Sequence, residues 1–472
     1  MATISSPGIG SGLDVNSIIT QLMAIERKPI DQLQTAQTKI KTQVSEVGKI
    51  KSAISKFGDL ATKLASSSFW KQTTGSASNS AVSVTTGSAA IAGSYKVEVE
   101  SLAYAQSIAS PTFASGATAL SAGTLHIEMG TWGAGQTSFT ANAAATAVDI
   151  TVEVTDTLAS LRDKINAAGA DVTASILTDA SGARLVMRSK STGAANAFRT
   201  SVTPGGGALD GLAFDPSSSV TGATQAQAAA DAVARINDLP VRSASNTMND
   251  VVDGVTLTFN NTTVDPMTVT VAADSAAIKK TLQDFASAYS DLAKLVATDT
   301  KYDASSKTAG PLQGDSAIVA MQSRLRSLLG STTAASTAFT RLSDAGFEQQ
   351  QDGSLTVNST KLDKALANLP QLQLMFANSS LTDPSLDGFG KRFKTVTDDL
   401  LGIDGTLTTR TQALNDKLDR NKDAQDRLEQ RLAQTQARLE KQYTMLDAKL
   451  GTLNSLSTYV TQQVAQWNKS SS

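Results

Sequence analysis

The chain has 472 residues, enough for about three domains of ordinary size. Its 41 basic and 43 acidic residues leave a formal charge of only −2, so it has no strong field to hold a nucleic acid or a membrane surface. It has no cysteine, which excludes disulfides and thiolate metal sites, and no apolar run reaches the roughly 20 residues that span a bilayer.

The first predicted elements are helical. Residues 1–12 are small and Gly-rich, and Asp14 is a candidate helix cap. Apolar residues at helical spacing define an N-terminal tip: Leu13, Ile18, Ile19, Leu22 and Met23. Pro29 predicts a break at Lys28, because a proline pushes the preceding residue out of the helical region. A longer helix is then expected over residues 31–64.

Apolar residues on this longer helix recur with the spacing of a coiled-coil seam. The seam residues are Leu33, Ile40, Val47, Ile50, Ile54, Phe57 and Leu64. Burying each Leu, Ile or Phe contributes about 1.5–3 kcal/mol, so the seam is expected to have an apolar partner.

The middle of the chain changes to the two-residue period of strands. Alternating Val and Tyr residues predict strands within 73–105, and similar strands return within 228–274. We expect these two sets to pair, since each alone makes only a small sheet. Residues 106–227 form a second β-rich body between them, with a short helix at 157–168 and a turn at 179–182.

From Ser275 the pattern is again mostly helical. Helices are predicted over 278–296, 316–329 and 360–367, and a long helix begins near Leu407. If that helix continues to Trp467, it is roughly 90 Å long at the usual rise per residue.

The long helix carries a second seven-residue register. Its apolar positions are Leu418, Leu432, Leu439, Leu446, Leu453, Val460 and Trp467. The polar residues Asn421 and Gln425 interrupt the two rows of this seam, and a polar residue there lowers stability but can specify register or partner number. The alternative is a surface helix with a partial apolar stripe.

The two seams together predict an α+β multidomain protein. A helical coiled-coil leg is formed by the N- and C-terminal segments, which pack antiparallel, and two nested β-rich head domains are inserted between them. The predicted division is an N-terminal helical tip (1–40, disordered when free), the leg (41–72 and 275–430), the inner head (73–105 and 228–274), the outer head (106–227) and a C-terminal coiled-coil tip (431–472). The outermost parts, before Pro29 and after about Leu450, are expected to bind helices of partner subunits.

No catalytic, cofactor-binding or metal site is predicted. His126 is the only histidine and is expected to face outward on a strand. A Ser-His-Asp triad therefore has no second candidate base, and no cluster of histidines can hold a metal. The Gly run at residues 8–12 follows no strand, and the acidic pair Asp398 and Asp399 lacks the spacing of a calcium loop. The pattern favours a part of an assembly over an enzyme.

Several local motifs resemble one family across nearly the full chain. They are Pro7–Asp14 with Ile18–Met23, the strand Gly93–Val99 with Ala105 and Gln106, residues 157–187 around Leu161–Asn166, residues 232–257 with Asn237, and residues 342–376 with Asp352 and Gly353. The family is the bacterial flagellar filament cap protein (hook-associated protein 2, FliD). Residues 157–187 are similar to the small insert motif that cap proteins share with flagellins.

The resemblance implies a homo-oligomeric cap, usually a pentamer, at the distal tip of the extracellular flagellum, where it promotes insertion and polymerisation of exported flagellin. The implied partners are other copies of the chain, flagellin, hook–filament junction proteins, the flagellar type III export apparatus and an export chaperone. No cofactor, nucleic acid or membrane span is implied. Export without a cleaved signal agrees with a start whose first basic residue is Arg27.

Two alternatives stay open. The first is an adhesin whose head binds surface glycans, although Trp132 is the only tryptophan of the head and sugar platforms usually need aromatic faces. The second is a flagellin-like structural subunit, since flagellins share the insert motif and the helical ends. The resemblance over residues 232–376 favours the cap.

Overall fold

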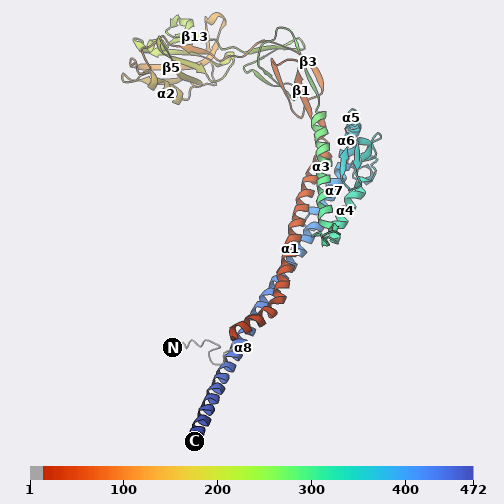
Figure 1. Ribbon diagram of the computed structural model, residues 1–472. Helices are drawn as coiled ribbons and strands as arrows, with labels where there is room; N and C mark the ends of the chain where they lie inside the picture. Colours follow the sequence, from red (N-terminus) through yellow and green to blue (C-terminus); the bar gives the residue numbers. More distant parts are fainter. Residues whose placement is uncertain (1–13, 471–472) are drawn as a thin grey trace. The chain divides into compact units, whose positions relative to one another are not determined.

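The computed structural model describes residues 14–470 (Figure 1). Contacts divide the chain into two compact units: unit 1 comprises Met1–Trp70 and Ser275–Ser472, and unit 2 comprises Lys71–Asp274. Unit 1 is mostly helical and unit 2 is mostly β-sheet. The predicted α+β class, with a β-rich region inserted between helical ends, is confirmed.

Unit 1 is built on two long helices, α1 (Val15–Ala65) of 51 residues and α8 (Thr406–Ser470) of 65 residues. The shorter helices are α3 (Ser275–Thr300), α4 (Ser316–Leu329), α5 (Ser359–Leu366), α6 (Leu369–Ala377) and α7 (Phe389–Leu401). Two small hairpins join β19 (Tyr302–Asp303) to β20 (Thr308–Ala309) and β21 (Phe347–Gln349) to β22 (Leu355–Val357). Helices α3, α4 and α5 match the predicted ones, whereas α6 and α7 were not predicted.

The predicted break at Lys28 is wrong, because α1 continues through Pro29. Inside a helix a proline removes one backbone hydrogen bond and crowds the carbonyl of Ile25, at a cost of about 3 kcal/mol. Burial on both sides offsets this cost: Ile19 and Ile30 are 6 % and 1 % exposed. The exposed ion pair between Arg27 and Asp31, at 3.7 Å, also bridges the proline. Tertiary packing therefore overrides the local preference.

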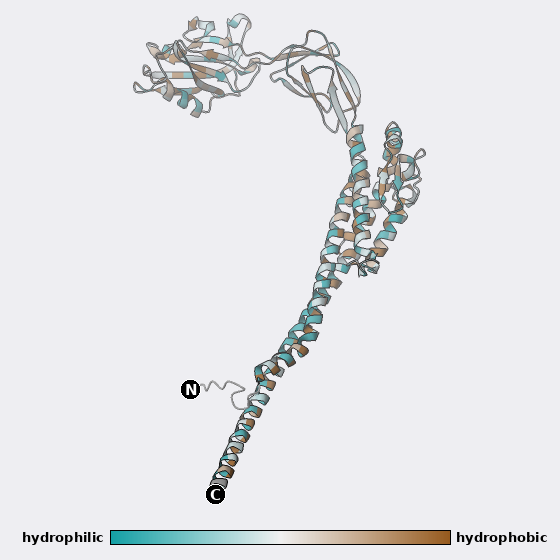
Figure 2. Cartoon of the chain, viewed as in Figure 1, coloured by the Kyte–Doolittle hydropathy of each residue, from teal (hydrophilic) through white to brown (hydrophobic). Residues whose placement is uncertain are grey.

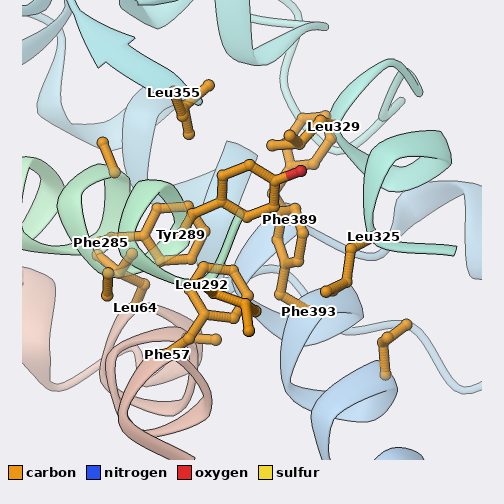
Figure 3. Close-up of a cluster of buried hydrophobic side chains, with 14 of the residues drawn as sticks. Phe57, Leu64, Phe285, Tyr289, Leu292, Leu325, Leu329, Leu355, Phe389 and Phe393 are labelled. Carbon is orange, nitrogen blue, oxygen red and sulfur yellow. The ribbon is translucent and has the colours of Figure 1, made fainter. Parts of the chain in front are cut away.

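A single hydrophobic core joins the helices of unit 1 (Figure 3). Phe57 of α1 lies at its centre, with ring centroids 4.7 Å from Phe285 of α3 and 5.3 Å from Phe393 of α7. The end of α1 is closed by Trp70, whose indole N–H donates to the Leu64 carbonyl at 2.8 Å. These contacts hold α1, α3 and α7 together as one bundle.

Unit 2 contains two bodies, each with its own core. The inner body has the strands β1 (Thr73–Ala77), β2 (Val82–Thr86), β3 (Gly93–Ser101), β14 (Ala232–Ile236), β15 (Leu239–Ser243), β16 (Thr247–Val252), β17 (Val255–Phe259) and β18 (Met267–Ala273). They form a five-stranded sheet, β1-β18-β3-β14-β15, and a three-stranded sheet, β16-β17-β2.

Strands from the two ends of unit 2 pair with each other in both sheets, as predicted. β3 pairs antiparallel with β14 and β18, and β2 pairs with β17. The tight turn from β14 to β15 places Asn237 and Asp238 at φ 47° and 67°, a conformation that Asn and Asp tolerate better than most residues. This gives a physical reason for the asparagine in the motif.

The outer body is inserted between β3 and β14. Its elements are β4 (Ser107–Ala109), β5 (Gly123–Trp132), β6 (Phe139–Ala141), β7 (Val148–Val152), α2 (Leu158–Ala167), β8 (Val172–Asp179), β9 (Gly182–Ser189), β10 (Ala197–Thr203), β11 (Phe214–Asp215), β12 (Val220–Thr221) and β13 (Thr224–Gln227). One sheet has the order β12-β11-β10-β5-β6 with β7 also on β5, and the other has the order β13-β4-β9-β8.

The fully buried Gln106 links the two sheets of the outer body. Its side-chain amide donates to the Phe198 carbonyl at 2.7 Å, and its oxygen accepts from the Trp132 indole at 3.1 Å. His126 lies on β5 with its Nδ1 2.5 Å from Asp149 Oδ1 and about a third of its side chain exposed, as predicted for an outward-facing residue.

Candidate assembly interface

Helices α1 and α8 lie side by side and run antiparallel (Figure 1). Lys51 Nζ donates to Thr408 Oγ1 at 3.2 Å near the start of α8. Farther along α8, Asn421 Nδ2 donates to the Leu33 carbonyl at 3.1 Å. Increasing residue numbers in α8 therefore pair with decreasing residue numbers in α1, so the two helices are antiparallel, as predicted.

The start of α8 is also anchored to α4 by a partly buried ion pair. Arg410 Nε donates to Asp315 Oδ2 at 2.6 Å, and the Asp315 side chain is only 4 % exposed. The same carboxylate caps α4 by accepting from the Ala317 N–H at 3.1 Å. Because both charges are paired, this end of α8 has a defined position within unit 1.

The predicted α1 seam divides into two environments. Five of its residues are fully buried in the core of unit 1, where α3 and α7 also pack on α1: Val47, Ile50, Ile54, Phe57 and Leu64. Leu33 and Ile40 are half-buried. The part of the seam near Phe57 is therefore a bundle core rather than a two-helix coil.

The polar residues of the α8 seam contact each other and α1. Asn421 is 9 % exposed, and its oxygen accepts from Gln425 Nε2 at 2.6 Å while its nitrogen donates to Leu33 of α1. A one-residue slip of α1 against α8 would move the Leu33 carbonyl away from this amide. This contact supports the role in setting the register that the sequence suggested.

Burial decreases along the predicted α8 seam. Leu418, Leu432 and Leu439 are half-buried. The later positions are exposed: Leu446 by 44 %, Leu453 by 59 %, Val460 by 51 % and Trp467 by 76 %. Figure 2 shows hydrophobic residues recurring along these last turns of α8. The boundary falls near Leu446, slightly before the predicted Leu450.

The exposed apolar residues continue beyond the single seven-residue register. Met445, Leu456, Tyr459 and Val464 are also about half exposed. At about 100° per residue, the exposed apolar side chains from Met445 to Trp467 cover an arc of about 140°. We call the exposed apolar residues of this segment the outer α8 face: Met445, Leu446, Leu453, Leu456, Tyr459, Val460, Val464 and Trp467.

Charge also changes along α8. Charged residues are frequent from Arg410 to Lys449, but none occurs from Leu450 to Trp467. A helix on the surface of a globular protein normally carries charged residues on the side opposite its apolar stripe. The combination of a wide apolar arc and an uncharged opposite side is the feature that sequence reasoning missed, although composition alone could have revealed it.

The residues of the predicted N-terminal tip lie near the beginning of α1. Ile19 is buried, Ile18 and Met23 are half-buried, and Leu22 is 37 % exposed. Leu13 lies outside the described residues. Val15, 2 % exposed, is a buried position of this segment that was not predicted. That the tip is disordered in the free protein stays a prediction.

Within residues 14–470, no group of three or more His, Asp or Glu side chains is arranged to hold a metal ion. No helix in this part of the chain is both long and apolar enough to cross a membrane. The candidate site is therefore the surface of the terminal coil.

The fold and this surface define a structural assembly protein. Its two long terminal helices pack against each other and contribute to the core of unit 1. The end of the longer helix exposes an apolar face that can bind other helices. Family models agree: residues 11–106 match the flagellar hook-associated protein 2 N-terminus, residues 229–455 match its C-terminus, and residues 135–191 match the flagellin hook IN motif.

Individual proteins match over almost the whole length. The B-type flagellar hook-associated protein 2 of Pseudomonas aeruginosa is 32 % identical, with 95 % of this chain and 94 % of the relative covered. Flagellar hook-associated protein 2 of Escherichia coli K12 is 30 % identical, with 98 % of each chain covered. The crystal structure of the D1-D2-D3 domains of the E. coli flagellar cap protein FliD aligns with a TM-score of 0.61 and 27 % identity, covering 78 % of this chain and 99 % of that one.

The chain belongs to the flagellar hook-associated protein 2 (FliD) family. Membership assigns it to the bacterial flagellum and to filament capping, in a family of structural rather than catalytic proteins. None of the relatives named above is described as an adhesin. The predicted family and function are confirmed.

Proposed function

We propose that the outer α8 face attaches this cap to the distal end of the flagellar filament. The observation that carries the proposal is the exposed apolar arc from Met445 to Trp467, in a segment without charge after Lys449. A face about 140° wide exceeds what a two-stranded seam uses, so it suits contact with more than one helix. The N-terminal tip, with Ile18, Leu22 and Met23 incompletely buried, contributes beside it.

The cap is a homo-oligomer, and five copies is the number that the family resemblance implies. The proposed working parts are the leg (41–72 and 275–430), the inner head (73–105 and 228–274), the outer head (106–227) and the two tips (1–40 and 431–472). The separate cores of the two β-rich bodies support the division of the head.

The proposed partners are flagellin, which the cap inserts into the growing filament, and the hook–filament junction proteins that it meets before the first flagellin. The flagellar type III apparatus exports the chain to the outside without a cleaved signal, assisted by an export chaperone. The tips gain part of their contacts only when they dock on the filament. The cap therefore binds the filament weakly for the interface area that it buries, and this allows the cap to advance. The work is assembly without catalysis.

The adhesin alternative has little support in the head. Trp132 is half-buried, and its ring packs against Phe139 and Phe214 at centroid distances of 4.7 and 5.8 Å. Its faces are thereby engaged within the outer body rather than presented as an open sugar platform.

Immunogold electron microscopy of intact flagella with an antibody against this chain tests the proposal. We expect one cluster of label at the distal tip of each filament. Label distributed along the shaft would indicate a flagellin-like subunit, and label on the cell surface without tip label would indicate an adhesin. Either result would contradict a cap.

A further inference from the structure

Asp299 is a buried carboxylate in which one of the two oxygens lacks a hydrogen-bond partner. It lies in the last turn of α3, is 5 % exposed, and its Oδ2 atom makes no hydrogen bond. Removing a charged carboxylate from water without pairing it is strongly unfavourable. The protonated acid is much less costly to bury.

The surroundings of Asp299 also disfavour its negative charge. The C-terminal end of a helix carries a partial negative charge, which repels a carboxylate in the last turn. Burial, and then the charge of Glu46 on α1, raise the pKa of Asp299 above its ordinary value of 3.8, while Lys49 acts in the opposite direction. Lys49 is itself held by Glu46, with Nζ 2.9 Å from Oε1, and its side chain is 59 % exposed.

Besides α1, the segment 301–315, which carries β19 and β20, also lies next to Asp299. Its Leu312 N–H donates to the Asp299 carbonyl at 2.9 Å, and Leu312 is fully buried. From α1, Gln43 Nε2 donates to the Pro311 carbonyl at 3.0 Å. The charged groups acting on Asp299 thus come from α1, whereas the contacts of this segment with Asp299 and Gln43 are made by backbone groups.

We propose that Asp299 is a proton-binding site that tightens the packing of α1 and segment 301–315 on the end of α3. When the carboxyl is protonated, the repulsion from Glu46 and from the helix end disappears. When it is ionised, the same three elements must enclose a charged carboxylate whose Oδ2 atom has no hydrogen-bond partner. Proton release therefore loosens this part of unit 1.

The direction of the pH dependence follows from the raised pKa. Because the folded state holds the proton more tightly than the unfolded state, the stabilisation is fully present below the ordinary pKa of 3.8. It is lost as the pH rises through the raised value. The wild-type protein therefore carries a local penalty at neutral pH.

A bound cation is the competing explanation for two neighbouring carboxylates. Glu46 already pairs with Lys49, and no third acidic or histidine ligand joins the pair among residues 14–470. Calcium and magnesium usually require more oxygen ligands than this pair supplies. The proton is thus the better occupant.

The test compares Asp299→Asn with the wild type by thermal unfolding of the full-length protein at a series of pH values from about 4 to about 8. Asparagine keeps the shape and removes the charge. We expect the variant to melt about 2–4 °C higher near pH 8, with the gap closing toward pH 4. Hydrogen exchange of segment 301–315 should also be slower in the variant at neutral pH.

The control is Asp284→Asn, which removes an exposed α3 carboxylate paired with Lys280 at 2.8 Å. It should leave the melting temperature nearly unchanged or slightly lower at neutral pH. A lower melting temperature of Asp299→Asn at every pH, or a gap that does not change with pH, would overturn the proposal. So would a calcium- or magnesium-dependent rise in the wild type that Asp299→Asn lacks, since it would make the site a cation site.

Discussion

Replacing Leu453 and Val460 together by aspartate is expected to abolish filament growth without unfolding the protein. Both side chains are more than half exposed, so the folded chain tolerates the change. On docking, each new carboxylate would be buried without a partner, at a cost of several kcal/mol. Attachment should weaken by roughly 1,000-fold or more, since each 1.4 kcal/mol is a factor of ten. Filament length in a capless host that expresses the variant is the measurement.

The matched control places two aspartates on the opposite side of the same helix. Ser455 and Gln462 are also seven residues apart, and at about 100° per residue they lie about 200° from Leu453 and Val460. Ser455→Asp with Gln462→Asp should retain filaments. If the first pair of substitutions leaves filament length normal, the outer α8 face is not the attachment surface. If both pairs abolish growth, the helix is sensitive to charge everywhere and the apolar arc has no special role.

The second large effect is on stability. Phe57→Ala should lower the free energy of unfolding of unit 1 by about 3–5 kcal/mol, because it leaves a cavity among Phe285, Tyr289 and Phe393. That is a large share of the roughly 5–15 kcal/mol that stabilises a typical domain. Urea unfolding followed by far-ultraviolet circular dichroism measures it. Among the described residues, unit 2 has only the short α2, so the helical signal reports unit 1.

Phe339→Ala serves as the comparison, since Phe339 packs at the edge of the same core and is only partly buried. Its loss should be clearly smaller. Equal losses in the two variants would mean that Phe57 is not central to the packing of α1.

The helical ends and the nested strands could be predicted because each carries a local repeating pattern. The seven-residue spacing on α1 and α8, and the alternation in β3 and β17, depend only on the side of the element that is buried. Asp14 could likewise be recognised as a cap, and its side chain accepts from the Ser17 N–H at 2.9 Å. Thr157, predicted as the first residue of a short helix, is instead its N-cap and accepts from the Ser160 N–H at 3.2 Å.

The features that were not predicted correctly depend on contacts between residues distant in sequence. Pro29 signals a break locally, and only the burial of Ile30 shows why the helix continues. Helix α7 was missed although Phe389, Phe393, Val396 and Leu400 have helical spacing, because a segment of 13 residues without a clear cap is a weak signal. The strand order of the outer body rests on pairings that no local pattern specifies.

The candidate interface was only partly predictable for a similar reason. The seven-residue register of α8 extends from Leu418 to Trp467 with only Gln425 polar, so the pattern alone does not say where the inner coil ends. In the described part of the chain α1 begins at Val15, and the predicted α8 seam is exposed from Leu446 onward. The loss of charge after Lys449 marks the same region independently, and it was readable from composition.

Deleting the gene for this chain in its own host is the strongest test of filament capping. We expect bare hooks together with unpolymerised flagellin in the medium, and filaments restored when the wild-type chain is supplied again. Filaments of normal number and length on the deletion strain would contradict it.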